Sequence, residues 1–179
     1  MAKNVLIISA TPRKGGNSEL LAQAFADGAK DAGNEVEMIS LRDKNLLFCK
    51  GCLACQKTGR CVLKDDAPEI TGKMQAADVL VFATPIYYYS VSGQMKTMLD
   101  RSNPLYNSDY KFRDVYLLST AAEDDPETPK PAELVLQGFT DCFPKARVAG
   151  TIFAGGVTSP GDIQNHPALK TAYDAGKAV

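Results

Sequence analysis

The amino-acid sequence predicts an α/β fold: a doubly wound parallel sheet of five strands with helices on both faces. Three apolar runs have the pattern of strands buried on both faces of a parallel sheet, namely residues 3–9, 78–84 and 114–120. Segments with helical spacing of apolar residues lie between them. Such an alternation requires right-handed crossovers between parallel strands.

The first half of the chain begins with the strand over residues 3–9 and a Gly-rich turn. A helix over about 17–33 follows, because Asn17 or Ser18 can cap its start. Residues 35–41 alternate polar and apolar side chains, which is typical of an edge strand.

The second half of the chain keeps the same alternation. After a cysteine-rich segment, a helix is expected from about Asp65, where acidic side chains suit a helix N-terminus. The other elements follow in order: strand 78–84, helix 92–102, strand 114–120, helix 131–143, strand 147–154 and helix 165–177. Strand and helix patterns resume on both sides of the acidic loop 121–131, so we expect one domain over residues 1–179.

Composition and charge exclude several classes of protein. The 179 residues have a net charge of -1 and contain no basic block, so nucleic acid is not an expected partner. The apolar run near the N-terminus is too short for a signal peptide or a membrane span, so we expect a cytoplasmic protein without membrane contact. Four of the five cysteines fall within residues 49–61, which is unlike a secreted disulfide framework and indicates metal or redox chemistry.

The loop at residues 9–18 (SATPRKGGNS) has the composition of a phosphate site. Doubly wound sheets bind ligands beyond the carboxyl ends of their strands, and this loop joins such an end to a helix N-terminus, which favours an anion. Its hydroxyl, glycine and arginine residues suit a terminal phosphate monoester. The P-loop and GxGxxG patterns are absent, and the loop lacks the cysteine of a phosphatase. The alternative is an ordinary turn with a good helix cap.

The loop at residues 84–94 (TPIYYYSVSGQ) also runs from a buried strand into a helix. Three consecutive tyrosines, Tyr87 to Tyr89, cannot all point into one core, so at least one is expected to face solvent, a partner chain or a planar ligand. Tyrosines packed in the core or at an interface are the alternative.

Together, residues 11–18 (TPRKGGNS) and 84–101 (TPIYYYSVSGQMKTMLDR) resemble the NAD(P)H-dependent FMN reductase branch of the flavodoxin-like superfamily, which also contains the iron-sulfur flavoproteins. The resemblance covers about the first 120 residues. It implies a strand order of 2-1-3-4-5 and an FMN held at three loops, of which the third matches only by position. The residues that it assigns to FMN are Ser9, Thr11, Pro12, Arg13, Gly16, Asn17 and Ser18 in the first loop, Pro85, Ile86, Tyr87, Tyr88, Tyr89 and Ser90 beside the isoalloxazine ring, and Thr120 and Ala121 in the third loop.

The resemblance implies an FMN-dependent oxidoreductase that passes electrons from NAD(P)H to a small acceptor such as a quinone or a flavin. The flavin carries this chemistry, so no catalytic residue is expected. Two alternatives stay open: an electron carrier of the iron-sulfur flavoprotein type that takes electrons from ferredoxin, and a flavin-binding protein without activity. The aromatic and apolar surface of the tyrosine loop and the cysteine segment predicts a homodimer or tetramer.

The cysteine segment has the spacing C-x2-C-x2-C-x5-C, formed by Cys49, Cys52, Cys55 and Cys61. This spacing resembles the compact motif with which iron-sulfur flavoproteins hold a [4Fe-4S] cluster, and four dense cysteines are what such a cluster needs. A thiol-rich structural loop is the first alternative. Structural zinc is the second and weaker one, because zinc sites usually separate two short cysteine pairs by a longer loop. Cys142 is expected in the core, far from this set.

Four other ionisable residues receive no catalytic role. Lys96, Asp100 and Arg101 recur in the family's helix after the tyrosine loop, but they equally suit a solvated helical face. The single histidine, His166, lies at a helix start and is expected to cap it or to lie at the surface.

Overall fold

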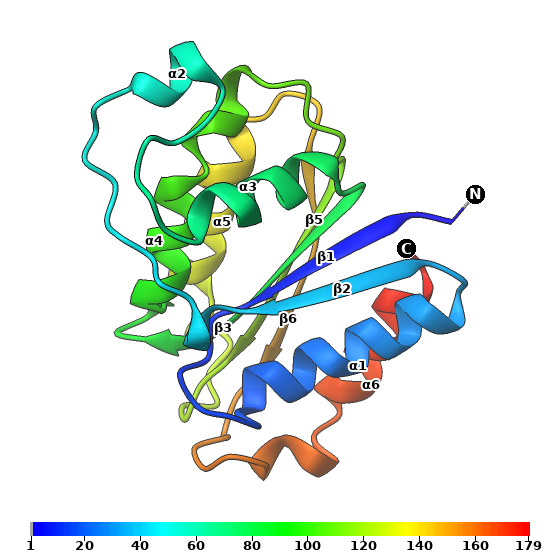
Figure 1. Cartoon of the computed structure of the whole chain (residues 1–179). Helices are drawn as coiled ribbons and strands as arrows, with labels where there is room; N and C mark the ends of the chain where they lie inside the picture. Colours follow the sequence, from blue (N-terminus) through cyan, green and yellow to red (C-terminus); the bar gives the residue numbers. More distant parts are fainter. Residues whose placement is uncertain (1) are drawn as a thin grey trace.

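The computed structural model describes residues 2–179 and has the predicted fold class (Figure 1). Within these residues, parallel strands form one sheet in the order β2-β1-β3-β5-β6, which confirms the expected flavodoxin-like strand order. Their bounds are Asn4–Ser9 for β1, Glu35–Ser40 for β2, Val79–Tyr87 for β3, Asp114–Thr120 for β5 and Arg147–Ala154 for β6.

Helices cover both faces of the sheet, which is why its central strands are apolar on both sides (Figure 1). One face carries α1 (Asn17–Asp31) and α6 (Ala168–Lys177), and the other carries α3 (Ala67–Ala76), α4 (Gly93–Arg101) and α5 (Lys130–Asp141). The short helix α2 (Ala54–Thr58) belongs to the cysteine segment and lies away from the sheet. His166 accepts the Ala168 N–H at 3.1 Å and so caps the start of α6, as expected. None of the helices in the described part of the chain is long and apolar enough to cross a membrane.

α1 and α6 approach each other closely at two glycines. A methyl group on Gly28 would overlap the carbonyl group of Tyr173, whose carbon would lie 2.8 Å away. A methyl group on Gly176 would overlap the carbonyl group of Phe25, whose carbon would lie 2.9 Å away. The two helix backbones are therefore in contact without a side chain between them.

Several boundaries differ from those predicted; α6, for example, begins at Ala168 and not at residue 165, which belongs to the 3-10 helix Asp162–Asn165. β3 continues past Thr84 to Tyr87, and Ser90–Val91 form an additional short strand, β4, which pairs antiparallel with the end of β3. The tyrosine loop is therefore a hairpin rather than an open loop. α3 begins slightly later than expected, at Ala67, and the carboxylate of Asp65 both accepts the Ala67 N–H at 3.2 Å and takes part in an ion pair.

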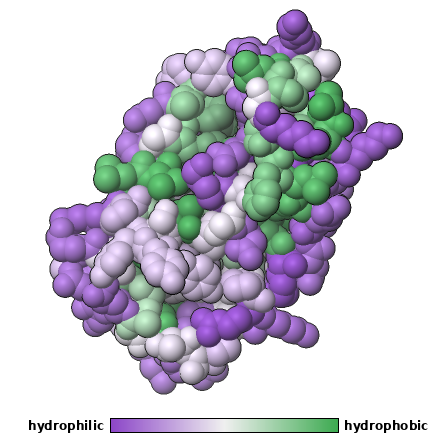
Figure 2. Space-filling model, turned by 90° about the vertical axis from the view of Figure 1, so that its left-hand side faces the viewer, coloured by the Kyte–Doolittle hydropathy of each residue, from purple (hydrophilic) through white to green (hydrophobic). Residues whose placement is uncertain are grey.

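Large apolar side chains are exposed on the cysteine segment and on the tyrosine loop. Phe48 is 80% exposed, and Leu53, Val62 and Tyr88 are also at the surface. Hydrophobic patches interrupt the polar surface on the face that carries these two segments (Figure 2). Such patches are typical of surfaces that bind another molecule.

Candidate functional site

The carboxyl ends of β1, β3 and β5 bring the three predicted loops to one edge of the sheet (Figure 1). Ser9 at the end of β1 pairs with Ala83 of β3, and Pro85 of β3 pairs with Thr120 of β5. This is the edge at which doubly wound sheets bind ligands. The predicted site residues therefore share one edge although they are far apart in the sequence.

The predicted residues fall into three groups by burial. The buried ones are Ser9, Thr11, Gly16, Asn17, Ser18, Pro85, Thr120 and Ala121. The exposed ones are Pro12, Arg13, Tyr87, Tyr88 and Tyr89, and the half-buried ones are Ile86 and Ser90. The buried group builds the edge itself, and the exposed group lies where a ligand arriving from solvent meets the protein first.

The first loop, between β1 and α1, has the features of an anion site. Its backbone turns through Gly15, whose φ is +64°, and a Cβ at Gly16 would collide with the Thr11 hydroxyl group. The hydroxyl groups of Ser9 and Ser18 are buried and have no hydrogen-bond partner within residues 2–179. Most buried polar groups in folded proteins are hydrogen-bonded. An anion at the N-terminus of α1 would supply the missing acceptor.

Two residues of this loop hold the segment that follows β6. The side-chain amide of Asn17 donates to the Ser159 carbonyl oxygen at 2.9 Å and accepts from the Gly161 N–H at 3.1 Å. Arg13 Nη1 donates to the Thr158 carbonyl oxygen at 2.7 Å. No local sequence pattern predicts these contacts, because they join opposite ends of the chain. That Arg13 and Asn17 also contact a phosphate remains a prediction.

The tyrosine loop is a tight hairpin with a strained tip. Tyr87 pairs with Ser90, so Tyr88 and Tyr89 form a two-residue turn with φ values of +49° and +60°. Left-handed backbone costs a residue other than glycine roughly 1–2 kcal/mol. The exposed fractions are 44% for Tyr87, 101% for Tyr88 and 53% for Tyr89, which confirms that tyrosines of this loop are presented outward. Strain of this kind is typical of ligand sites, and exposed rings suit a flat ligand.

Hydrogen bonds couple the first loop to the second, and the pairing of Pro85 with Thr120 couples the second to the third. The hydroxyl group of Ser92, the N-cap of α4, donates to the Ala10 carbonyl oxygen at 3.3 Å, and the Ser92 N–H donates to the Thr84 hydroxyl oxygen at 3.0 Å. The carboxylate of Glu123 in the third loop lies near the Tyr89 hydroxyl group and raises the pKa of Tyr89. The edge is therefore held as one unit. Ser92 was not among the predicted site residues, although its position before a helix was an available signal.

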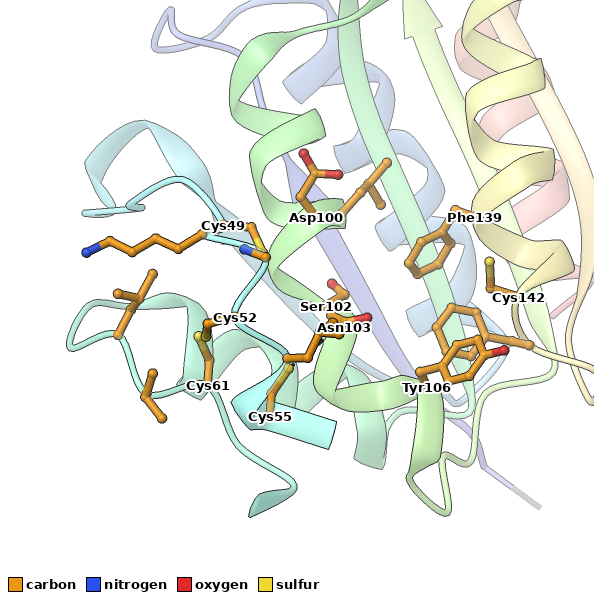
Figure 3. A pocket seen from close by; sticks show the side chains of 17 residues that line it. Cys49, Cys52, Cys55, Cys61, Asp100, Ser102, Asn103, Tyr106, Phe139 and Cys142 are labelled. Carbon is orange, nitrogen blue, oxygen red and sulfur yellow. Dashed lines mark hydrogen bonds between the residues drawn. The ribbon is translucent and has the colours of Figure 1, made fainter. Parts of the chain in front are cut away.

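The cysteine segment lines a separate pocket of about 450 Å³ beside the C-terminal end of α4 (Figure 3). Cys49, Cys52, Cys55 and Cys61 all contribute to its wall and carry free thiols. Cys142 lines the same pocket from the other side, and it is exposed. The prediction that Cys142 lies in the core, far from the other cysteines, is therefore wrong. Cys142 directly follows the last residue of α5, and that end of the helix lines the cysteine pocket.

Two of these sulfurs accept hydrogen bonds from side chains. Asn103 Nδ2 donates to Cys55 Sγ at 3.2 Å, and Arg101 Nη2 donates to Cys61 Sγ at 3.4 Å. Among the described residues, no three His, Cys, Asp or Glu side chains lie close enough together to hold a single metal ion. A [4Fe-4S] cluster binds each thiolate through a different iron, so its ligands stand farther apart. Free thiols with N–H donors around one pocket fit such a cluster.

Arg101 is buried, which rules out the solvated position considered for it. Its side chain is 1% exposed and forms an ion pair with Asp65. Burial raises the pKa of Asp65, but hydrogen bonds from Arg101 and from the Leu47 N–H outweigh burial and hold that pKa below its usual value. Lys96 and Asp100, by contrast, form an exposed pair at 2.7 Å, as expected of a solvated face.

Comparison with known proteins identifies the family. The sequence pattern of the NADPH-dependent FMN reductase family matches residues 3–125. The chain belongs to this family. An iron-sulfur flavoprotein from Methanocaldococcus jannaschii is 34% identical to this FMN reductase family member over 187 residues, which cover 98% of the chain and 94% of the relative. An iron-sulfur flavoprotein from Archaeoglobus fulgidus is 39% identical over 109 residues, which cover 61% of the chain and 53% of the relative, about half its length.

Solved structures share the fold of this FMN reductase family member. An NAD(P)H:quinone oxidoreductase from Methanothermobacter marburgensis has a TM-score of 0.78 at 19% identity, covering 99% of this chain and 96% of that chain. A WrbA-like flavodoxin from Agrobacterium tumefaciens has a TM-score of 0.67 at 16% identity, covering 99% and 95% of the two chains. The family match identifies the protein as an oxidoreductase, and these structures show that its fold is flavodoxin-like. The family match includes the first two loops, the cysteine segment and the start of the third loop, whereas the segment held by Arg13 and Asn17 lies beyond it.

Proposed function

We propose that the protein binds FMN at the carboxyl edge of the sheet and passes electrons from NAD(P)H to a small acceptor such as a quinone or a flavin. The observation that carries this proposal is the pair of buried hydroxyl groups of Ser9 and Ser18, which lack a partner within residues 2–179. When bound, FMN supplies the hydride and electron chemistry. The chain then has to bind the flavin, orient it and leave it open to the donor and the acceptor.

The first loop holds the phosphate of FMN in this proposal. Ser9, Thr11 and Ser18 would donate hydrogen bonds from their hydroxyl groups, and Gly16 leaves room because it has no Cβ. Arg13, exposed at the mouth of the loop beside Pro12, would add positive charge, and Asn17 holds the loop in place through the segment after β6. The oxygens of the phosphate monoester would accept hydrogen bonds from the buried hydroxyl groups of Ser9 and Ser18, which lack a partner within residues 2–179.

The ring of FMN lies against the other two loops in this proposal. Residues 85–90, from Pro85 to Ser90, would border its face and edge, and Thr120 and Ala121 would border its other side. The pairing of Pro85 with Thr120 joins these two loops where they leave the sheet. No acid or base from the chain is required, since the flavin itself exchanges the electrons.

The cysteine pocket favours a second candidate function, that of an electron carrier of the iron-sulfur flavoprotein type. Cys49, Cys52, Cys55 and Cys61 would hold a [4Fe-4S] cluster, which exchanges single electrons with a donor such as ferredoxin. Support comes from the free thiols that share one pocket, and from the relatives that are named iron-sulfur flavoproteins.

A visible spectrum and anaerobic kinetics separate these functions. NADH or NADPH oxidation with a quinone acceptor would support the reductase. Electron uptake from reduced ferredoxin without NAD(P)H oxidation would support the carrier. Binding of FMN with neither activity would indicate a flavin-binding protein that is not an enzyme, and failure to bind FMN in a fluorescence titration would contradict all three.

Ser9→Ala and Ser18→Ala are expected to weaken FMN binding by roughly 1–3 kcal/mol each, the cost of losing a hydrogen bond to a charged group. Binding of riboflavin, which has no phosphate, should hardly change. The free energy of unfolding of the flavin-free protein should stay the same or rise, because each substitution removes a buried hydroxyl group without a partner. Fluorescence titration and urea unfolding measure the two effects.

A buried serine elsewhere provides the matched control. The Ser102 hydroxyl group donates to the Met98 carbonyl oxygen at 2.8 Å. Ser102→Ala should therefore leave FMN binding unchanged and lower the free energy of unfolding by about 1 kcal/mol. Equal losses of FMN and riboflavin affinity in Ser9→Ala and Ser18→Ala would refute the phosphate assignment.

We also propose that the protein forms a homodimer or a tetramer. Phe48, Leu53 and Tyr88 are large side chains exposed at the surface, and hydrophobic patches interrupt the polar surface of one face (Figure 2). Burial against a second chain would remove such surface from water. Light scattering at micromolar concentration should give two or four times the mass of one chain. A monomer under those conditions would count against the proposal.

A further inference from the structure

The cysteine segment is a loop whose two ends are joined. The Asn45 N–H donates to Asp66 Oδ2 at 2.7 Å, and the Asp66 N–H donates to the Asn45 carbonyl oxygen at 3.0 Å. Next to this pair, the Leu47 N–H donates to Asp65 Oδ2 at 2.8 Å. All four clustered cysteines lie between these closed ends, so the loop is shaped before any ligand enters it.

Arg101 of α4 fills the closed neck of this loop. Its Nη1 donates to the Leu47 carbonyl oxygen at 2.6 Å, and its Nη2 donates to Asp65 Oδ1 at 2.8 Å. The same Nη2 also donates to Cys61 Sγ at 3.4 Å. The hydrogen bond to Asp65 raises the pKa of Arg101, so the guanidinium stays charged. Arg101 thus fixes both ends of the loop and contacts one of its sulfurs.

Asn103 makes a similar contact to a second sulfur. It lies just beyond α4 in the short 3-10 helix Asn103–Asn107, and its Nδ2 donates to the buried Cys55 Sγ at 3.2 Å. The two donors therefore reach the cysteine pocket from one short stretch of chain outside the cysteine segment. Neither belongs to the cysteine motif itself.

We propose that Arg101 and Asn103 are positioning residues of the cysteine site, which direct N–H groups at Cys61 and Cys55 and thereby raise the reduction potential of a cluster bound there. This inference rests on the proposed [4Fe-4S] cluster. Reduction by dithionite would add one electron to a bound cluster and break no bond, so the sulfurs of Cys55 and Cys61 would carry more negative charge. N–H donors aimed at sulfur stabilise that added charge. Because Asp65 balances the charge of Arg101, the higher reduction potential would come from the directed N–H groups and not from net charge.

The test is a redox titration of the reconstituted holoprotein with dithionite, followed by the visible spectrum of the cluster. Asn103→Ala should lower the midpoint potential, and Arg101→Lys, which keeps the charge beside Asp65 but loses the forked donor, should do the same. We expect about a tenfold shift of the redox equilibrium for each variant, which is 59 mV for a one-electron couple. Asn103→Asp should lower the potential further, because an oxygen replaces the N–H.

Asn107 provides the matched control, because it belongs to the same 3-10 helix but is exposed. Asn107→Ala should keep the wild-type potential. Iron release to a chelator should be faster in Asn103→Ala and Arg101→Lys than in wild type and Asn107→Ala. If Arg101→Lys fails to fold, the midpoint potential of Asn103→Ala alone tests the inference.

Three outcomes would overturn the inference in distinguishable ways. Wild-type protein that takes up no iron would refute the proposed cluster together with the inference. Variants that retain about four irons with unchanged potentials would refute the role of the two donors and leave the cluster standing. If the midpoint potential of Asn107→Ala shifted as much as that of Asn103→Ala, the shift would not come from hydrogen bonds to sulfur.

Discussion

Anaerobic reconstitution is expected to give about four irons and four sulfides per chain, and changing any one of Cys49, Cys52, Cys55 or Cys61 to alanine should lower this yield sharply. Each thiolate holds a different iron, so the loss of one ligand opens the cluster to solvent and to chelators. All four side chains line one pocket, and the loop that carries them is closed at its neck without the cluster. Iron and sulfide analysis measures the effect.

Cys142→Ala is the control for this prediction. Cys142 lines the far side of the same pocket and donates from its thiol to the Gly138 carbonyl oxygen within α5, so iron uptake should not change. FMN binding should persist in all five variants, because the three flavin loops contain no cysteine. A wild-type iron content near zero would identify the segment as a thiol-rich structural loop. Full iron retention in the alanine variants would reject these cysteines as ligands.

Gly28→Ala and Gly176→Ala are each expected to lower the free energy of unfolding by about 1–3 kcal/mol or more, as overpacking does. In both cases the added methyl group overlaps a backbone carbonyl group of the facing helix, and backbone cannot move aside as a flexible side chain can. α1 and α6 would have to separate, which exposes apolar surface between them. Urea unfolding followed by circular dichroism measures the loss.

The same substitution in another helix should have the opposite effect. Gly138 lies within α5, and a methyl group there meets nothing within 4 Å. Gly138→Ala should therefore raise the free energy of unfolding by up to about 1 kcal/mol through helix propensity. If Gly28→Ala and Gly138→Ala shift stability in the same direction, close backbone contact is not what Gly28 provides.

The sheet could be predicted from the sequence because its signals are local. Residues 114–120 and 147–154 have strand patterns with the bounds that the structure gives to β5 and β6. An apolar run buried on both faces, followed by a helix, leaves few arrangements other than a parallel sheet. The edge that carries the three loops follows from that arrangement, since the strands all point the same way.

The contacts that complete the sites could not be predicted, because they join distant segments. Arg101 has the sequence surroundings of an exposed helical residue, and only the packing of the cysteine loop against α4 buries it. The sequence around Cys142 suits a core residue, and only the packing of α5 against the cysteine pocket shows that Cys142 lines it. The two-residue turn of the hairpin could not be predicted either, because Tyr88 and Tyr89 stand where Asn and Gly usually mark such a turn.

α4 reaches from one candidate site to the other. Its N-cap, Ser92, is bonded to the first two flavin loops, and its last residue, Arg101, lies in the neck of the cysteine loop. At about 1.5 Å per residue, the nine residues of α4 span about 13 Å. A hydrogen-bonded helix barely stretches, so it serves as a molecular ruler that keeps the two sites of one chain at a constant interval. Inserting or deleting a turn of α4 would change the distance between the proposed flavin site and the proposed cluster site, while each site kept its own residues.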